Sequence, residues 1–323
     1  MIQNDVLKIL KAGKNVYVTG PAGSGKTHAL REYIEHLRHH GVGVALTATT
    51  GIAATHIGGV TIHSWSGIGI KDYLSDHHIQ EIAGKEYLAK RYKNTEVLII
   101  DEVSMLSAEM FDSIERLARH MKGNFEPFGG MQIVLSGDFF QLPPIAREGK
   151  QVSFINRSQA WNNSDIRICY LETQFRQEDD NLESLLSEIR SGEVSELTFE
   201  TLQERQGVEP DENITKLFTH NKDVDSLNDK QLDLIEGVAH EFYMESKGKK
   251  NLVENIKKGL LAPEVLRLKK GAAVMFIKNN FEEGYVNGTL GTVIDFKDDQ
   301  PIVETRDGKE IRVESAEWKV EEE

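Results

Sequence analysis

The sequence has very little cysteine: Cys169 is the only one in 323 residues. A single cysteine allows neither a disulfide within the chain nor a metal site built from several cysteines, and it fits a reducing compartment. No apolar run approaches the length of a membrane span, and the first residues lack the charged-then-apolar layout of a signal peptide. We therefore expect that the protein does not associate with a membrane. We also expect it to be cytoplasmic, or nuclear or organellar in a eukaryote.

Basic residues are also scarce. The chain has 38 Lys and Arg against 52 Asp and Glu, which gives a net charge of −14. This balance argues against a protein that coats nucleic acid through a broad basic surface. It does not exclude a motor with a local basic groove, because a few positioned groups make the phosphate contacts. The length is sufficient for two or three globular domains.

What the chain does contain is a phosphate-loop pattern at residues 20–27. The apolar run Val16–Thr19 predicts a buried strand before the loop, and the apolar spacing over residues 28–40 predicts a helix after it. Glycines let the backbone approach phosphate, and the helix start exposes amides. We expect Lys26 to neutralise the β- and γ-phosphates and the Thr27 hydroxyl to ligate Mg²⁺. The residues that we assign to nucleotide binding here are Gly20, Gly23, Ser24, Gly25, Lys26 and Thr27.

Two carboxylates follow the most apolar run of the chain, residues 97–102. Such a run is typical of a strand that is buried on both faces of a parallel sheet. Ligands bind beyond the carboxyl ends of such strands. Asp101 is therefore expected to hold Mg²⁺, and Glu102 to orient and deprotonate the attacking water.

A further buried strand is predicted at residues 131–136, and it runs into Gly-Asp-Phe-Phe-Gln-Leu-Pro-Pro at residues 137–144. The amide of Gln141 is expected to sense the γ-phosphate on a loop that the two prolines stiffen. A strand is also predicted at residues 166–171, and Arg176 follows it. Arg176 is a candidate arginine finger, with an ordinary surface ion pair as the alternative.

Small residues and hydroxyls follow the strand predicted at residues 43–47, in the stretches 48–54 and 58–64. They allow close approach of another backbone and offer hydrogen bonds to phosphates, although a plain strand-to-helix connection has the same composition. Residues 66–95 are more polar, with helical tendency. Lysines concentrate in residues 247–270, which form either a patch that faces nucleic acid or a solvated linker.

The order of these motifs resembles the superfamily 1B DNA helicases, and most of all the petite-integration-frequency (PIF) family, which is related to RecD. The motifs that carry the resemblance are GPAGSGKT, TATTGIAA, TIHS, LIIDEVSML, GGMQIVLSGDFFQLPP and FRQ. Residues 110–119 resemble the signature of that family. The resemblance implies an ATP- and Mg²⁺-dependent translocase that moves 5′-to-3′ on single-stranded DNA, acts as a monomer and serves DNA repair, recombination and telomere maintenance.

The resemblance also implies roles for single residues. Gln3 corresponds to the glutamine that reads adenine, Gln141 to the γ-phosphate glutamine, and Arg176 to the arginine of the fourth motif. Lys26, Thr27, Asp101 and Glu102 match the ATP and Mg²⁺ residues. The motifs that touch the DNA strand contain Thr49, Thr50, Thr61, His63 and Ser64.

We predict an α/β protein with a RecA-like P-loop NTPase parallel sheet, a partial second RecA-like domain and a small SH3-like β-barrel. The expected domains are residues 1–205, with a small insertion at 66–95, then 206–264 and 265–323. The tail reads as β, with Asp307-Gly308 as a hairpin turn. The later motifs of the family are not matched in residues 294–323, so we expect a C-terminally shortened motor. The alternatives are a nucleic-acid-binding or regulatory protein without productive unwinding and a small-molecule phosphotransferase.

Overall fold

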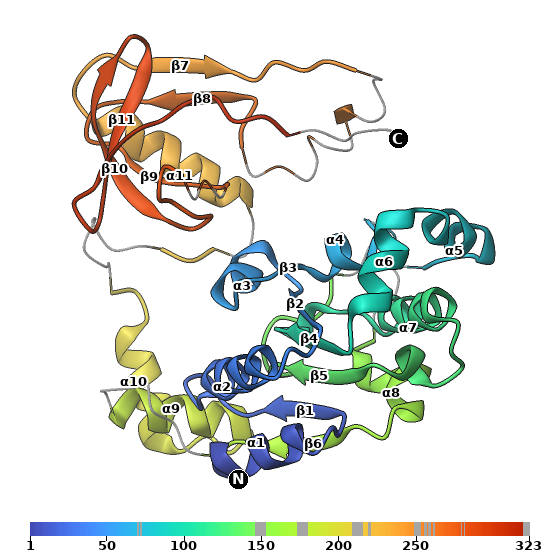
Figure 1. Ribbon diagram of the computed structural model, residues 1–323. Helices are drawn as coiled ribbons and strands as arrows, with labels where there is room; N and C mark the ends of the chain where they lie inside the picture. Colours follow the sequence, from blue (N-terminus) through green and yellow to red (C-terminus); the bar gives the residue numbers. More distant parts are fainter. Residues whose placement is uncertain are drawn as a thin grey trace. The chain divides into compact units, whose positions relative to one another are not determined.

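The chain folds into two compact units, Met1–Val208 and Glu209–Glu323, in a computed structural model (Figure 1). The structure describes the whole chain except residues 70, 72, 146–152, 173–179, 209–215, 219–220, 249–252, 255–256, 258–259, 261, 279, 281 and 319–323.

A parallel sheet organises the first unit. Six strands of its described part are hydrogen-bonded in the order β3-β2-β4-β5-β1-β6, and every neighbouring pair is parallel. The predicted α/β class with a RecA-like parallel sheet is therefore confirmed. The strands are β1 (Val16–Thr19), β2 (Val44–Ala48), β3 (Val60–Thr61), β4 (Val97–Asp101), β5 (Gln132–Ser136) and β6 (Arg167–Tyr170).

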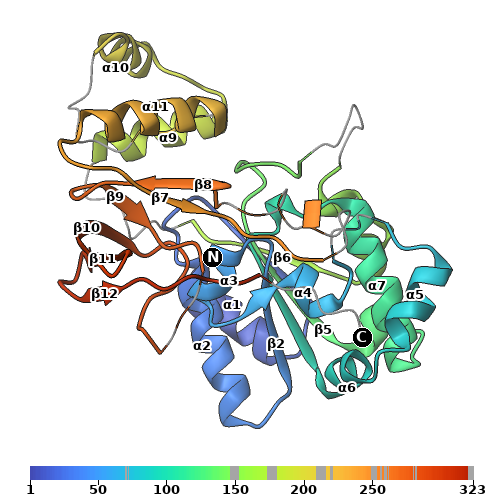
Figure 2. The ribbon, with the colours of Figure 1, turned by 90° about the horizontal axis from the view of Figure 1, so that it is seen from above.

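Helices cover both faces of this sheet (Figure 2). On one face α1 and α2 bury Val6, Leu10 and Leu30 against the strands, and on the other face α7 buries Phe111 and Ile114. The helices of this unit are α1 (Gln3–Lys11), α2 (Lys26–His39), α3 (Gly51–His56), α4 (Ile62–Ser66), α5 (Asp76–Ala83), α6 (Glu86–Asn94), α7 (Ala108–Lys122), α8 (Gln159–Asn163), α9 (Asp180–Ser191) and α10 (Glu196–Arg205), with short 3₁₀ turns η1 (Val103–Met105), η2 (Pro127–Gly130) and η3 (Ile155–Arg157).

Local sequence signals set the limits of α7. The Ser107 hydroxyl accepts a hydrogen bond from the Met110 amide and begins the helix, and Gly123 ends it in the left-handed conformation. The insertion predicted at 66–95 contains α5 and α6, whose Ile79, Leu88 and Tyr92 join the core on the α7 side. None of the helices described in the structure combines the length and apolar character that a membrane span requires.

The second unit is built on antiparallel strands. One sheet has the order β12-β11-β10-β9, and β7 pairs with β8. The hairpin predicted at Asp307-Gly308 is confirmed, because β11 and β12 flank it as antiparallel partners. That residues 206–264 begin a second RecA-like domain and residues 265–323 form a barrel stays a prediction. The elements are α11 (Asn221–Leu234), β7 (His240–Tyr243), β8 (Val265–Leu268), β9 (Ala273–Met275), β10 (Leu290–Lys297), β11 (Gln300–Thr305) and β12 (Glu310–Arg312).

Candidate nucleotide-binding site

The strand order brings the predicted nucleotide residues to one edge of the sheet. β1 and β4 both pair with β5, with Val18 opposite Ser136 and Ile100 opposite Leu135. Because the strands are parallel, the segments that follow them leave at the same edge. The phosphate loop, the Asp101-Glu102 pair and the segment 137–144 are therefore neighbours, although up to 124 positions separate them in the sequence.

The phosphate loop runs directly into α2. Gly25 precedes the helix in the left-handed conformation, with φ of 86°, and no side chain caps the helix start. The Nζ of Lys26 donates to the carbonyl oxygens of Gly20 (2.9 Å) and Pro21 (3.0 Å). Burial lowers the pKa of this amine, while the nearby carboxylates, Asp138 first among them, oppose the shift. The loop thus presents backbone amides and one cation, the groups that bind phosphate.

Gln3 lies against this loop from the start of α1. A Cβ atom on residue 25 would come within 1.8 Å of its Nε2 atom, so the end of the Gln3 side chain lies directly against Gly25. The structure therefore brings Gln3 and the phosphate loop together, 22 positions apart in the sequence. The side chain of Gln3 is half-buried, unlike that of a solvent-facing glutamine.

The two carboxylates after β4 differ in their surroundings. Asp101 is 5% exposed, and its Oδ1 accepts a hydrogen bond of 3.0 Å from the Glu102 amide. Burial raises the pKa of Asp101. Burial also raises the pKa of the half-buried Glu102, and the charge of Asp101 adds to the effect. A cation bound beside these two carboxylates would offset the free-energy cost of burying their charges.

The segment after β5 is anchored by an ion pair that the sequence did not predict. Arg190 of α9 donates from Nη1 to Oδ2 of Asp138 (2.6 Å) and from Nη2 to Oδ1 (3.0 Å). The same Oδ1 accepts from the backbone amide of Phe140, and the Asp138 carbonyl accepts from the backbone amide of Gln141. Gln141 is exposed. Nothing in the sequence distinguishes Arg190 from the many other charged residues. The one available signal was the position of Asp138 just after a buried strand, because a buried carboxylate needs a cationic partner.

The candidate strand-binding residues lie at and after the ends of β2 and β3, which pair with Ala48 opposite Thr61, the last residue of β3. The hydroxyls of the three threonines among them already have partners within the protein. Thr49 Oγ1 donates to the Glu102 carbonyl (2.7 Å), Thr50 Oγ1 accepts from Ala53 at the start of α3, and Thr61 Oγ1 accepts from Ser64 at the start of α4. In the same segment, His63 is half-buried and Ser64 exposed.

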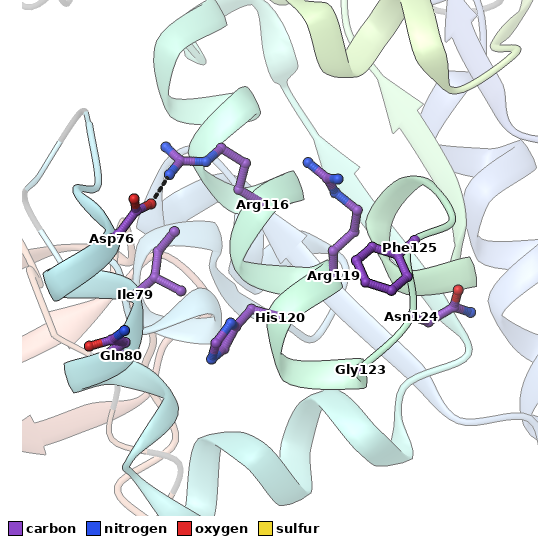
Figure 3. A pocket seen from close by; sticks show the side chains of 9 residues that line it. All are labelled: Asp76, Ile79, Gln80, Arg116, Arg119, His120, Gly123, Asn124 and Phe125. Carbon is purple, nitrogen blue, oxygen red and sulfur yellow. Dashed lines mark hydrogen bonds and ion pairs between the residues drawn. The ribbon is translucent and has the colours of Figure 1, made fainter.

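Arg176, the candidate finger, lies outside the described residues. The family-signature stretch 110–119 lies in α7 and is mostly buried. Its Arg116 and Arg119 face an open groove of about 530 Å³ beside α5, where Arg116 pairs with Asp76 at 2.6 Å (Figure 3). This groove shares no residue with the nucleotide site.

A parallel sheet with a phosphate loop after β1 and an acidic pair after β4 defines a P-loop nucleotide-binding protein with a RecA-like fold. Comparison with known sequences agrees. The family model "PIF1-like helicase" matches residues 2–200, and the model "DNA helicase Pif1, 2B domain" matches residues 251–296. The chain belongs to the PIF1-like helicase family.

Individual sequences and solved structures similar to this chain are also Pif1 helicases. The chain is 46% identical over 312 residues to an ATP-dependent DNA helicase Pif1 of Psychrobacter. The matched region covers 94% of this chain and 47% of that relative. It thus spans about half of that relative's length. The crystal structure of the Pif1 helicase from Candida albicans covers 99% of the chain and is itself covered to 79%, with a TM-score of 0.88 and 33% identity. A Pif1 helicase from Bacteroides, solved with ADP-AlF3 and single-stranded DNA, has a TM-score of 0.75 and 28% identity, over 96% of this chain and 73% of that one.

Proposed function

We propose that the protein is an ATP-dependent DNA helicase that translocates 5′-to-3′ on single-stranded DNA, or the portion of one that holds its ATP site. The observation that carries the proposal is the convergence at one sheet edge of a phosphate loop, an acidic pair and the anchored segment 138–141. The segments after β2 and β3 adjoin the same edge. A nucleotide site and a candidate strand-binding site are thus built on adjacent strands.

In this proposal the phosphate loop holds ATP and Lys26 stabilises the charge that develops on the γ-phosphate. The contact of Gln3 with Gly25 supports a role for its amide in reading the adenine. Glu102 is the base that orients the attacking water, and Gln141 senses the γ-phosphate. Arg176 remains the proposed arginine finger.

Mg²⁺ fits the donor set at this edge. The Thr27 hydroxyl and the buried Asp101 carboxylate are oxygen ligands of the kind that Mg²⁺ prefers. The raised pKa of Asp101 reports a buried carboxylate that a cation would favour in its charged form. When bound, Mg²⁺ neutralises charge on the β- and γ-phosphates.

Single-stranded DNA is the proposed partner, at Thr49, Thr50, Thr61, His63 and Ser64. The pairing of β2 with β3 supports this assignment, because it sets the two segments side by side. The Bacteroides relative of similar fold was solved with single-stranded DNA. Another related structure describes two coordinating Pif1 helicases at forked DNA. We propose that this chain acts on the strand as a monomer.

The test is ATP hydrolysis with and without a single-stranded oligonucleotide. We expect hydrolysis that the oligonucleotide stimulates, and its loss in Lys26→Ala. Lys11→Ala, which removes an exposed lysine at the end of α1, is the matched control. Unwinding of a duplex with a 5′ tail, and not of one with a 3′ tail, tests the direction. Hydrolysis that DNA does not stimulate would favour a phosphotransferase, and DNA binding without hydrolysis would favour a regulatory nucleic-acid-binding protein.

A further inference from the structure

The backbone of Glu102 has an unusual conformation. Its φ of 53° and ψ of 45° lie in the left-handed region, which residues with a Cβ atom rarely occupy. Such conformations persist where the surroundings hold them, and they concentrate at functional sites. The contacts that hold Glu102 therefore also decide where its carboxylate points.

Three contacts hold this residue. The Glu102 amide donates to Asp101 Oδ1 (3.0 Å), and the Glu102 carbonyl accepts from the Thr49 hydroxyl (2.7 Å). Gly137 of the neighbouring strand end packs against the next peptide, since a Cβ atom there would lie 2.9 Å from the Val103 nitrogen. Of the three, the bond from Thr49 is the one that comes from the segment after β2.

Thr49 belongs to the segment that we assign to the DNA strand. Its amide donates to the Asp101 carbonyl (3.3 Å) and continues the ladder beyond the Ala48–Asp101 pair. The next residue, Thr50, caps α3. A hydroxyl has a single proton to donate. While the bond to Glu102 stands, the Thr49 hydroxyl has no proton for a DNA phosphate.

We propose that Thr49 is a positioning residue for ATP hydrolysis, whose hydroxyl holds the Glu102 carbonyl and so directs the carboxylate at the attacking water. This inference rests on the proposed function, in which Glu102 is the base. A DNA strand bound along residues 49–50 then acts on hydrolysis through one hydrogen bond, because displacing Thr49 displaces the peptide of Glu102.

Thr49→Val tests the proposal, since it removes the hydroxyl and keeps the shape of the side chain. The chain offers a matched control in Thr47, whose hydroxyl donates to the Ile99 carbonyl at the same 2.7 Å, on the same strand pair and farther from the site. In steady-state hydrolysis with the oligonucleotide dT20, we expect kcat at saturating DNA to fall about tenfold in Thr49→Val, the effect of losing one well-placed hydrogen bond. The KM for ATP and the half-saturating DNA concentration should stay within about threefold.

Thr49→Ser retains the hydroxyl, and we expect it to restore most of kcat, whereas Thr47→Val should leave kcat unchanged. Circular-dichroism melting checks that each variant folds, and Thr49→Ala is the replacement if the valine does not fit. An unchanged kcat in Thr49→Val, or an equal fall in Thr47→Val, would overturn the proposal. So would a fall in DNA affinity with kcat unchanged, which would show that the Thr49 hydroxyl serves the DNA strand and not the Glu102 carbonyl. Failure of the proposed function is separate, because the unaltered chain would then hydrolyse no more ATP than Lys26→Ala.

Discussion

Arg190→Leu should destabilise the first unit strongly, because it leaves a buried carboxylate without its cation. The Asp138 side chain is 4% exposed, and the Arg190 side chain is 20% exposed. Among the described residues, Arg190 is the only partner of Asp138 in an ion pair. Removing one member of a buried pair costs about 3–5 kcal/mol. Here Asp138 Oδ1 retains the Phe140 amide and water can enter where Arg190 was, so we expect about 3 kcal/mol, the low end of that range.

For a unit of this size, about 3 kcal/mol corresponds to a fall in Tm of roughly 6–12 °C. Differential scanning calorimetry of the whole chain measures it. Arg116→Leu is the matched control, because its partner Asp76 is 88% exposed and its lost contacts should amount to about 1 kcal/mol. The double variant Arg190→Leu with Asp138→Asn should recover part of the loss, since no unpaired charge remains.

Two results would refute this reasoning. One is a fall in Tm for Arg190→Leu no larger than that for Arg116→Leu. The other is a double variant as unstable as Arg190→Leu, which would assign the effect to lost packing against Phe140, whose ring centroid lies 4.4 Å from the guanidinium carbon. Arg190→Lys separates charge from geometry, because lysine keeps the charge and loses the two parallel hydrogen bonds.

Three further outcomes are expected. Glu102→Gln should keep nucleotide affinity and lower kcat by about 10²-fold or more, and an unchanged rate would show that Glu102 is not the base. Because burial raises the folded-state pKa of Asp101, wild-type stability should decline as pH rises from the ordinary carboxyl pKa to that raised value. Asp101→Asn should therefore raise Tm at pH 8 without nucleotide, and this gain should shrink toward acid pH; a gain independent of pH contradicts the argument. Affinity for single-stranded DNA should fall linearly on a log–log plot against salt, and a flat titration would argue against phosphate contacts.

The sequence predicted the elements of the first unit well because their signals are local. Buried apolar runs bounded by glycine or polar residues marked Val16–Thr19 and the strand before Glu102. In the structure the ends of α7 have equally local causes, the Ser107 cap and Gly123. Strand ends in a parallel sheet share one edge, so the sequence alone indicates that the phosphate loop and the acidic pair meet.

What the sequence could not predict depends on contacts between distant positions. The Arg190–Asp138 pair joins residues 52 positions apart, and the Thr49–Glu102 bond joins residues 53 positions apart. No periodicity or motif encodes either contact. The Thr49–Glu102 bond depends on the order of the strands, and the Arg190–Asp138 pair depends on the path of α9. The left-handed backbone of Glu102 was equally invisible, since glutamate has no preference for that region.

The nucleotide edge concentrates charges that the apolar sheet cannot solvate, and each buried charge has a partner of its own. Asp138 has Arg190, Asp101 has the Glu102 amide, and Lys26 has two loop carbonyls. Phosphate oxygens would replace neutral carbonyls on Lys26, and a charge-assisted hydrogen bond is stronger than the one it displaces. Asp138 and Asp101 keep their own partners, so neither carboxylate has to move when Lys26 binds phosphate. Preorganisation of this kind is what makes electrostatic stabilisation of a transition state effective.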